Sequence, residues 1–357
     1  EHTGRTLLDA PSLVKFRTDA KTAFHLVFGT ALALPPRLFP RWSSGLFLRT
    51  KARRAYLFPR LVLRMGSGMR MDDRRYPDAL SSPFLRADRI ESKMIELLID
   101  GQISSSLAML MAWLVAVWIR NTSYVDVVWA YGVGVIGLYF LHQCSDLCSP
   151  QRLALLQGLL GVWSIRLGTH LLRRCRGQPE DIRYAYLRDY FGAKANLGFF
   201  LFFQVQAFWI VLFASPFLIL ARNPSELQVW DHLGLIIWVC GFAGVSLADR
   251  QLRNFKQVRG RTRKEVCESG LWKYSRHPNY FFEWVLWLGY LPMGIHSQGA
   301  IWLLVLPPLL YLFLTKITGI PFVEARKLEA SGKAYASYLT RVPSFFPRIP
   351  TKSKPPS

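Results

Sequence analysis

The sequence predicts an all-α integral membrane protein, a bundle of about seven transmembrane helices preceded by a basic, largely irregular N-terminal arm. Three observations predict this class: 51% of the 357 residues are apolar, only 19% are charged, and the apolar residues are clustered into long uncharged stretches. An average soluble domain carries about 25% charged residues. The composition therefore disfavours a soluble, disordered or fibrous protein.

The clustered apolar stretches have the length that membrane crossing requires. A helix needs ~20 largely apolar residues to cross the hydrocarbon core of a bilayer. We expect seven such spans, at roughly 103–119, 124–142, 152–172, 196–220, 232–248, 279–295 and 300–317. A soluble core would have to bury all seven at once, which makes a soluble helical protein the weaker interpretation.

Three regions follow from this pattern: a basic arm over 1–100, a transmembrane domain over 101–350 and a C-terminal tail over 351–357. The arm holds 18 of the 45 Lys and Arg residues and no full-length span, so we expect a protein partner to order it. The chain begins with Glu1 rather than Met, and we therefore expect it to be processed. Its Arg-rich start favours the mitochondrial inner membrane, with the endoplasmic reticulum and a bacterial inner membrane as alternatives.

The net charge of +22 predicts acidic partners such as phosphates, anionic lipids or an acidic protein. Nucleic acid is not expected, because the arm shows no recognisable nucleic-acid-binding fold. The charge also predicts the orientation, because short loops rich in Lys and Arg stay on the side where the protein is made. The loops after the first, third and fifth spans and the C-terminal tail should therefore share one face, the cytosol or the mitochondrial matrix.

The densest cluster of polar side chains lies at 249–283, between the fifth and sixth spans. Asn279 and Glu283 are four residues apart, so they share one helix face at the mouth of a span. An acidic residue inside a membrane helix is costly and marks a functional site by default. Cations beside an aromatic residue and an Asn–Glu pair suit a nucleotide that carries phosphates. For the basic run 259–264, contact with an anionic leaflet is the simpler interpretation.

Three more polar segments should lie on the same face of the membrane. One contains Tyr124 and Asp126, the second runs from Arg166 to Glu180 and beyond, and the third follows Glu324. Each segment is a weak signal by itself, but their convergence at one end of the bundle predicts a site.

Two other patterns do not predict binding sites. The glycines at 132, 134 and 137 spell a dinucleotide-binding motif, but they lie inside a span with no preceding strand, so close helix packing explains them better. Cys144 and Cys148 have the spacing of metal ligands but lack a nearby histidine, and we therefore predict no metal site.

The run Gly-Leu-Trp-Lys-Tyr-Ser-Arg-His-Pro-Asn-Tyr-Phe-Phe-Glu at 270–283 resembles the signature of membrane-embedded steroid 5α-reductase-like proteins, the 3-oxo-5-alpha-steroid 4-dehydrogenase family. A branch of unknown function is the most similar. Segments around Asp126, Arg166, Asp249 and Glu324 support the resemblance, which covers about residues 100–350 and leaves out the basic arm.

The resemblance implies an NADPH-dependent membrane oxidoreductase of lipid metabolism. NADPH would enter from the cytosolic-type face and reduce the C=C bond of a lipid or sterol-like enone held between the helices, with a hydrogen-bond donor on the substrate carbonyl. The implied cofactor residues are Asp249, Arg253, Arg276, Asn279, Tyr280 and Glu283, with Tyr335 or Tyr338. Their neighbours Lys256, Trp272 and His277 complete the predicted cofactor site. Asp126, Tyr124 and Glu180 are the candidates for polarising the substrate.

One residue departs from the family pattern. Phe282 stands where the family often has glycine, and a ring at this position is expected to narrow the cofactor channel.

Two other functions stay open. Isoprenylcysteine and phospholipid methyltransferases share the membrane bundle and a similar Arg-His-Pro-x-Tyr run, and they use S-adenosylmethionine. Asn279 and the Asp249–Arg253 pair favour the reductase. Alternatively, the chain is an accessory subunit of a large respiratory-type complex that keeps the reductase fold, as the long arm and Phe282 suggest.

Overall fold

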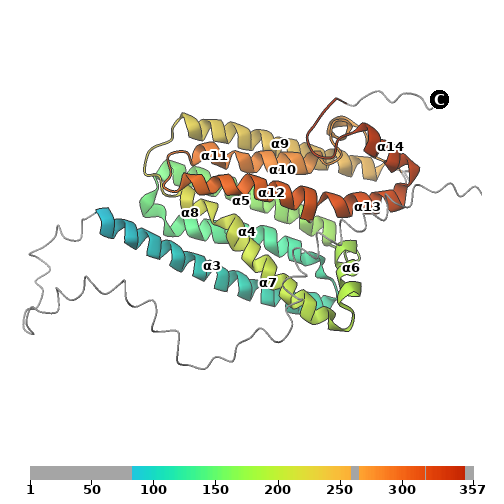
Figure 1. The fold of residues 1–357 in the computed structure, drawn as a ribbon, viewed down its shortest axis with the longest axis horizontal. Helices are drawn as coiled ribbons and strands as arrows, with labels where there is room; N and C mark the ends of the chain where they lie inside the picture. Colours follow the sequence, from blue (N-terminus) through green and yellow to red (C-terminus); the bar gives the residue numbers. More distant parts are fainter. Residues whose placement is uncertain (1–82, 259–264, 318, 350–357) are drawn as a thin grey trace, which may run out of the picture. The chain divides into compact units, whose positions relative to one another are not determined.

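The computed structural model describes residues 83–258, 265–317 and 319–349 (Figure 1). Within these ranges the chain is helical and contains no strand, which confirms the predicted fold class. The principal helices are α3 (Pro83–Ile119), α4 (Val125–Gln143), α5 (Pro150–Cys175), α7 (Ala195–Ala214), α9 (Val229–Gln257), α10 (Pro278–Leu288) and α13 (Ile320–Ser331).

Shorter elements connect the principal helices. They are η4 (Thr122–Tyr124), η5 (Ser145–Leu147), α6 (Ile182–Phe191), η6 (Gly192–Lys194), α8 (Pro216–Leu220), η7 (Gly270–Lys273), α11 (Tyr290–Met293), η8 (Ala300–Val305), α12 (Leu306–Leu312), η9 (Phe313–Ile317) and α14 (Lys333–Arg341).

Five helical segments among the described residues are long and apolar enough to cross a membrane. They are Ile90–Ile119, Thr122–Gln143, Ile182–Leu220, Val229–Gln257 and Ala300–Ser331. The expected spans at 152–172 and 279–295 are not among them, so the count of seven is not confirmed. The first of these two lies in α5, which carries several polar residues, and the second is divided between α10 and α11 at Gly289.

The first span begins earlier than the sequence predicted. Residues 83–100, which we assigned to the irregular arm, form the first part of α3. The charged residues there alternate with Leu and Ile, and Glu, Lys and Leu all favour a helix. Local charge therefore does not end the helix, and Pro83 stands at its first position, where proline is tolerated. The rest of the predicted arm and the tail lie outside the described residues.

Small residues set the distance between neighbouring helices. A Cβ atom on Gly241 of α9 would lie 2.4 Å from the backbone nitrogen of Leu286 in α10, and one on Gly234 would lie 2.4 Å from the carbonyl oxygen of Gly289. Such close backbone approach is typical of helix pairs in membranes.

The glycines of α4 also serve packing, as predicted. A Cβ on Gly134 would meet the Ser164 hydroxyl at 2.2 Å and one on Gly137 would meet Leu160 at 2.6 Å, both on α5, while Gly132 faces Ile210 of α7. The glycine motif thus permits α4 to approach α5 and α7 closely.

A buried arginine joins the helices at one end of the bundle. The Arg152 guanidinium on α5 forms a bidentate ion pair with Asp231 of α9, at 2.6 and 2.8 Å. It also donates to the carbonyl oxygens of Met293 and Glu226, at 3.1 and 3.2 Å. Both charged side chains are almost fully buried, and these partners satisfy them. One side chain therefore ties α5, α9, α11 and the loop before α9 together.

We expect Asp231→Ala to destabilise the fold strongly, because it leaves the buried Arg152 charge uncompensated. Removing one partner of a buried ion pair costs about 3–5 kcal/mol. The midpoint of thermal unfolding in detergent measures the effect. Glu268→Ala is the control, because it breaks the partly exposed Arg341–Glu268 pair, which should contribute at most about 1 kcal/mol. Equal losses in the two variants would show that the buried pair does not hold this end.

Candidate functional site

Two polar loops meet at the opposite end of the bundle, at the start of α4. The Thr122 amide donates to Glu180 at 2.8 Å, and Asp126 accepts hydrogen bonds from Arg183 at 2.7 Å and from the Tyr184 hydroxyl at 2.6 Å. These contacts connect the loop after the first span to the loop before α6. The predicted placement of both loops at one end is therefore confirmed for these residues.

The segment after α9 and the C-terminal segment meet at the same end. Arg276 donates through Nε to Glu324 at 2.7 Å, and its amide donates to the Pro343 carbonyl at 2.9 Å. The Tyr338 hydroxyl donates to the Trp272 carbonyl oxygen, and the Trp272 indole donates to the Ala248 carbonyl at 3.0 Å. These hydrogen bonds hold the last helix, α14, beside Asp249. We call this group of contacts the C-terminal clamp.

The centre of the site is a cluster of charged side chains between three helices. Arg166 of α5 pairs with Asp249 of α9 and lies 3.5 Å from Glu283 of α10. The Asn279 amide nitrogen donates to Asp249 at 3.3 Å. The Trp163 indole of α5 donates to Glu283 at 2.6 Å. All three charged side chains are at most 15% exposed, so the cluster sits inside the bundle.

Two buried polar atoms beside this cluster have no hydrogen-bond partner among the described residues. They are Oδ1 of Asn279 and the indole nitrogen of Trp129. Trp129 packs edge-on against Trp163, at 6.4 Å between ring centroids. Because buried polar atoms are nearly always hydrogen-bonded, the Asn279 acceptor, whose amide nitrogen is bonded to Asp249, is a candidate contact for a polar ligand.

A second group of cations gathers around the end of α9. The positive charges of Lys327 and Arg326 from α13, and of Arg174 from α5, all act on Lys256. Lys256 itself is exposed, as is Arg253 one turn earlier. Cations held together without a matching number of acids attract an anion, and phosphate groups are the anions that such clusters commonly bind.

The structure separates the predicted cofactor residues into those at or near the central cluster and those in the C-terminal clamp. Asp249, Asn279 and Glu283 lie in the central cluster. Tyr280 is on α10 with Asn279 and Glu283, and Arg253 and Lys256 are at the end of α9. The residues of the C-terminal clamp are Trp272, Arg276, His277, Tyr335 and Tyr338. The Nε and Nη1 atoms of Arg276 are bonded to Glu324 and to backbone carbonyls. Its role in cofactor binding stays a prediction.

The candidates for substrate polarisation lie in η4, in the first turn of α4 and in the loop before α6. Asp126 and Glu180 are both paired with arginines, and Tyr124 ends η4 two residues before Asp126. Carboxylates paired in this way accept hydrogen bonds rather than donate them. Their catalytic role stays a prediction.

Sequence reasoning placed Arg166 in a polar segment at this end, but it missed Trp163 and the contacts that α5 makes within the cluster. Trp163 holds Glu283, Arg166 joins two acids, and the His170 ring lies 3.6 Å from Asp249. These residues stand at i, i+3 and i+7, which places them on one helix face. That spacing of polar and indole side chains within an expected span was the signal that would have found them.

The Phe282 ring packs against helix α9. The ring lies over Gly244 of α9, where a Cβ atom would approach it to 2.2 Å. A large residue on α10 is therefore matched by the absence of a side chain on α9. The expected narrowing of the cofactor channel stays a prediction.

The pKa values of Glu180 and His277, both outside the spans, are shifted from their ordinary values. Burial tends to raise the pKa of Glu180, but hydrogen bonds from Arg188 and Thr122 outweigh burial and hold this pKa below its ordinary value. Burial lowers the pKa of His277 below 6.5, against the opposing effect of its 3.0 Å hydrogen bond with Glu324. Glu180 is therefore an anion and His277 a neutral hydrogen-bond donor at neutral pH.

We expect the clamp to weaken as the pH falls below about 6.5. The His277 pKa is lower in the folded than in the unfolded state, so the unfolded state binds more protons in this range and stability decreases with falling pH. His277→Gln keeps a donor for Glu324 and should flatten the dependence. Unfolding midpoints between about pH 5 and pH 8 test this, with exposed His142→Gln as the control. Parallel curves for wild type and His277→Gln would contradict it.

Comparison with known proteins assigns most of the transmembrane domain to a described family. Residues 112–342 match the sequence model of a family described as "Protein of unknown function (DUF1295)". An uncharacterized protein of Schizosaccharomyces pombe is 28% identical over 215 residues, which cover 53% of this chain and 62% of the yeast protein. The alignment therefore spans less than two thirds of that relative. The family match includes all of the central cluster and most of the clamp.

Proposed function

Because the chain belongs to the DUF1295 family, described as proteins of unknown function, we propose a function from its own site: an NADPH-dependent oxidoreductase of the steroid 5α-reductase-like type. It would reduce the C=C bond of a lipid or sterol-like enone within the membrane. The observation that carries this proposal is the buried cluster of Arg166, Asp249, Asn279 and Glu283, which has an unpartnered amide acceptor beside a group of cations.

The side chains present fit NADPH in two respects. Oδ1 of Asn279 is a buried acceptor without a partner among the described residues, and its orientation is set by the Nδ2 bond to Asp249. It suits the carboxamide N–H of a nicotinamide ring. Lys256, Lys327 and Arg326 suit the phosphate groups. When bound, NADPH supplies the hydride for the reduction.

In place of the cofactor role that the resemblance implies for Tyr280, we propose that its hydroxyl is the hydrogen-bond donor on the substrate carbonyl. Its ring stacks on His277 at 5.5 Å between centroids, and the charges of Arg183 and Asp126 act on its phenol. It therefore lies between the C-terminal clamp and the start of α4. Its hydroxyl makes no hydrogen bond to the part of the chain that the structure describes. During reduction of an enone, negative charge develops on the carbonyl oxygen, and a donor there stabilises the transition state.

The aromatic side chains around the cluster would exclude water from the reaction. Trp163 packs edge-on against Trp287 at 5.0 Å between centroids, and Trp287 packs against Phe213 at 5.7 Å. A low-polarity wall strengthens the hydrogen bonds within it. It also suits a substrate that dissolves poorly in water.

We keep the mitochondrial inner membrane as the proposed location and a protein as the proposed partner of the arm. The net charge of +22 and the basic start of the chain support both. The part of the arm before Pro83 lies outside the described residues.

We expect Asn279→Ala to weaken NADPH binding roughly tenfold without unfolding the bundle, because one buried hydrogen bond is lost. Fluorescence titration of the detergent-solubilised protein measures the NADPH dissociation constant. Asn254→Ala is the matched control, because Asn254 is exposed near the same end of α9. Unchanged NADPH affinity in Asn279→Ala would remove this residue from the site. If S-adenosylmethionine binds to the wild type and NADPH does not, the methyltransferase alternative is correct.

We expect Tyr280→Phe to lower the turnover of an enone by NADPH about 100-fold while leaving NADPH affinity unchanged, because only the phenol donor is removed. Turnover is measured with a panel of hydrophobic enones in mixed micelles. Tyr274→Phe is the control, because Tyr274 is exposed. Full activity in Tyr280→Phe would assign the donor to another group. A wild type that binds NADPH but reduces none of the enones, and that stays with a larger complex, would support the accessory-subunit alternative.

A further inference from the structure

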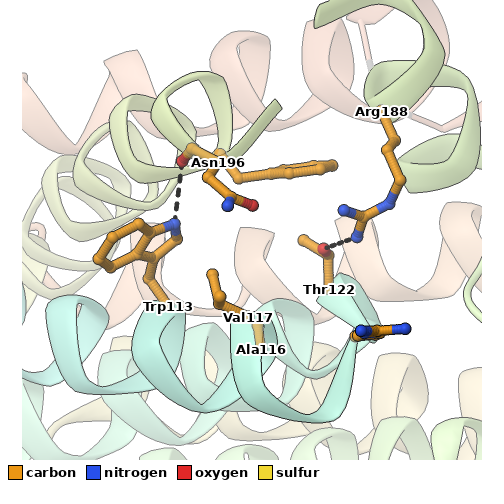
Figure 2. Close-up of a pocket in the computed structure, with 8 residues that line it drawn as sticks. Trp113, Ala116, Val117, Thr122, Arg188 and Asn196 are labelled. Atoms are coloured by element: carbon orange, nitrogen blue, oxygen red, sulfur yellow. Dashed lines mark hydrogen bonds between the residues drawn. The ribbon is translucent and has the colours of Figure 1, made fainter. Parts of the chain in front are cut away.

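A second site lies where α3 ends. A pocket of about 450 Å³ opens between the last turns of α3, the residues that follow them, and the starts of α7 and η4 (Figure 2). It shares no residue with the central cluster around Asp249 or with the C-terminal clamp. Its ligand would therefore be separate from the proposed cofactor and substrate.

The pocket has one apolar wall and one cationic edge. Trp113 and Val117 of α3 and Phe199 of α7 form the apolar wall. The Trp113 indole donates to the Asn196 carbonyl at 3.1 Å, which fixes the two helices on either side of the opening (Figure 2). Arg120 and Arg188 supply the cationic edge. A pocket of this kind fits an amphiphile with an anionic head.

Only one of the two arginines is available for such a head. Arg188 binds Glu180 at 2.7 and 3.0 Å and donates to the Thr122 hydroxyl at 3.2 Å (Figure 2). Its charge is therefore balanced. Arg120 is exposed and forms no ion pair with any described residue. Its charge is the uncompensated one at the mouth of the pocket.

The backbone at Arg120 favours glycine rather than arginine. Its φ angle is +54°, and the amide of Asn121 donates to the carbonyl of Ala116 at 3.1 Å. This is the hydrogen bond of a Schellman motif, in which the left-handed residue is usually glycine. Arginine therefore costs backbone free energy in this conformation. What it contributes is a cation, both to the C-terminal end of the α3 dipole and to the mouth of the pocket.

The position of the pocket also matches a lipid at the membrane surface. The first apolar span ends at Ile119, directly before Arg120. Trp118 is 84% exposed there, and Leu114 and Val115 are exposed one turn earlier. Exposed tryptophan at the end of a span is typical of the boundary between hydrocarbon and water. An acyl chain entering from the hydrocarbon would pass these side chains on its way to the pocket.

We propose that this pocket binds one anionic phospholipid, with its phosphate at Arg120 and the first part of an acyl chain against Trp113, Val117 and Phe199. The apolar wall requires the acyl chain, which a free anion lacks. Phosphatidylcholine has both a chain and a phosphate, but its choline cation neutralises the headgroup, so the unpaired Arg120 charge should favour a lipid with a net negative charge. This inference does not depend on the proposed reductase activity.

Native mass spectrometry of the detergent-solubilised full chain tests the proposal with phosphatidylglycerol, phosphatidylcholine and glycerophosphate as probes. We expect one phosphatidylglycerol per chain. Arg120→Gly should reduce its retention about fivefold, the effect expected for one cation beside an anionic headgroup. Because glycine relieves the backbone at this position, the unfolding midpoint of Arg120→Gly should equal or exceed that of the wild type. Val117→Trp should fill the pocket and remove the lipid.

The control is Arg176→Gly, which removes an exposed arginine of the same basic end that also lacks an ion pair with a described residue. Retention of phosphatidylglycerol should be unchanged in this variant. Equal losses in Arg120→Gly and Arg176→Gly would reduce the effect to general surface charge and overturn the proposal. So would equal retention of phosphatidylcholine and phosphatidylglycerol, or glycerophosphate binding as strongly as the lipid, which would make this a free-phosphate site.

Discussion

Two carboxylates, Asp249 and Glu283, lie inside a helix bundle whose walls are largely apolar, and the arrangement depends on the Arg166 guanidinium between them. Each buried charge would cost several kcal/mol by itself. Arg166 contacts both acids, and indole donors from Trp163 and Trp287 hydrogen-bond to Glu283. The cluster thereby fixes the contact of α5 with α9 and α10.

The sequence predicted the end of the bundle at which these groups meet more reliably than it predicted their partners. Charge in short loops fixes the side of the membrane, and the contacts of Thr122 with Glu180 and of Arg276 with Pro343 agree with that assignment. Partner choice depends on helix rotation and on distances between helices, which one sequence does not determine. Arg276 illustrates the difference: its cofactor role stays a prediction, but its pairing with Glu324 is a contact that the sequence did not indicate.

Element boundaries failed for a related reason. The start of α3 is rich in charge, and the pattern was therefore assigned to an irregular arm, although Glu, Lys, Leu and Ile within it are compatible with a helix. Helix formation is a local backbone property, whereas membrane insertion depends on hydropathy summed over a full span. Phe282 shows a second feature that hydropathy does not reveal. Its ring occupies the space left by Gly244, so the fit of this side chain depends on a residue 38 positions earlier in the sequence.

The two ends of the bundle are both held by a buried arginine, and the comparison separates a structural role from a functional one. At one end, the polar atoms around Arg152 are matched by Asp231 and by backbone carbonyls. At the other end, Arg166 faces two acids, while Asn279 Oδ1 and the Trp129 indole keep no partner among the described residues. Within the described part of the chain, unpartnered polar atoms also occur at the first end, on Ser149, Arg222 and Ser297, so the lack of a partner does not by itself separate the two roles. The difference lies in the charges: Arg152 has one acid and backbone carbonyls as partners, whereas Arg166 joins two acids beside the cations around Lys256. This charge arrangement, together with the Asn279 acceptor next to it, is what the proposed ligand site rests on.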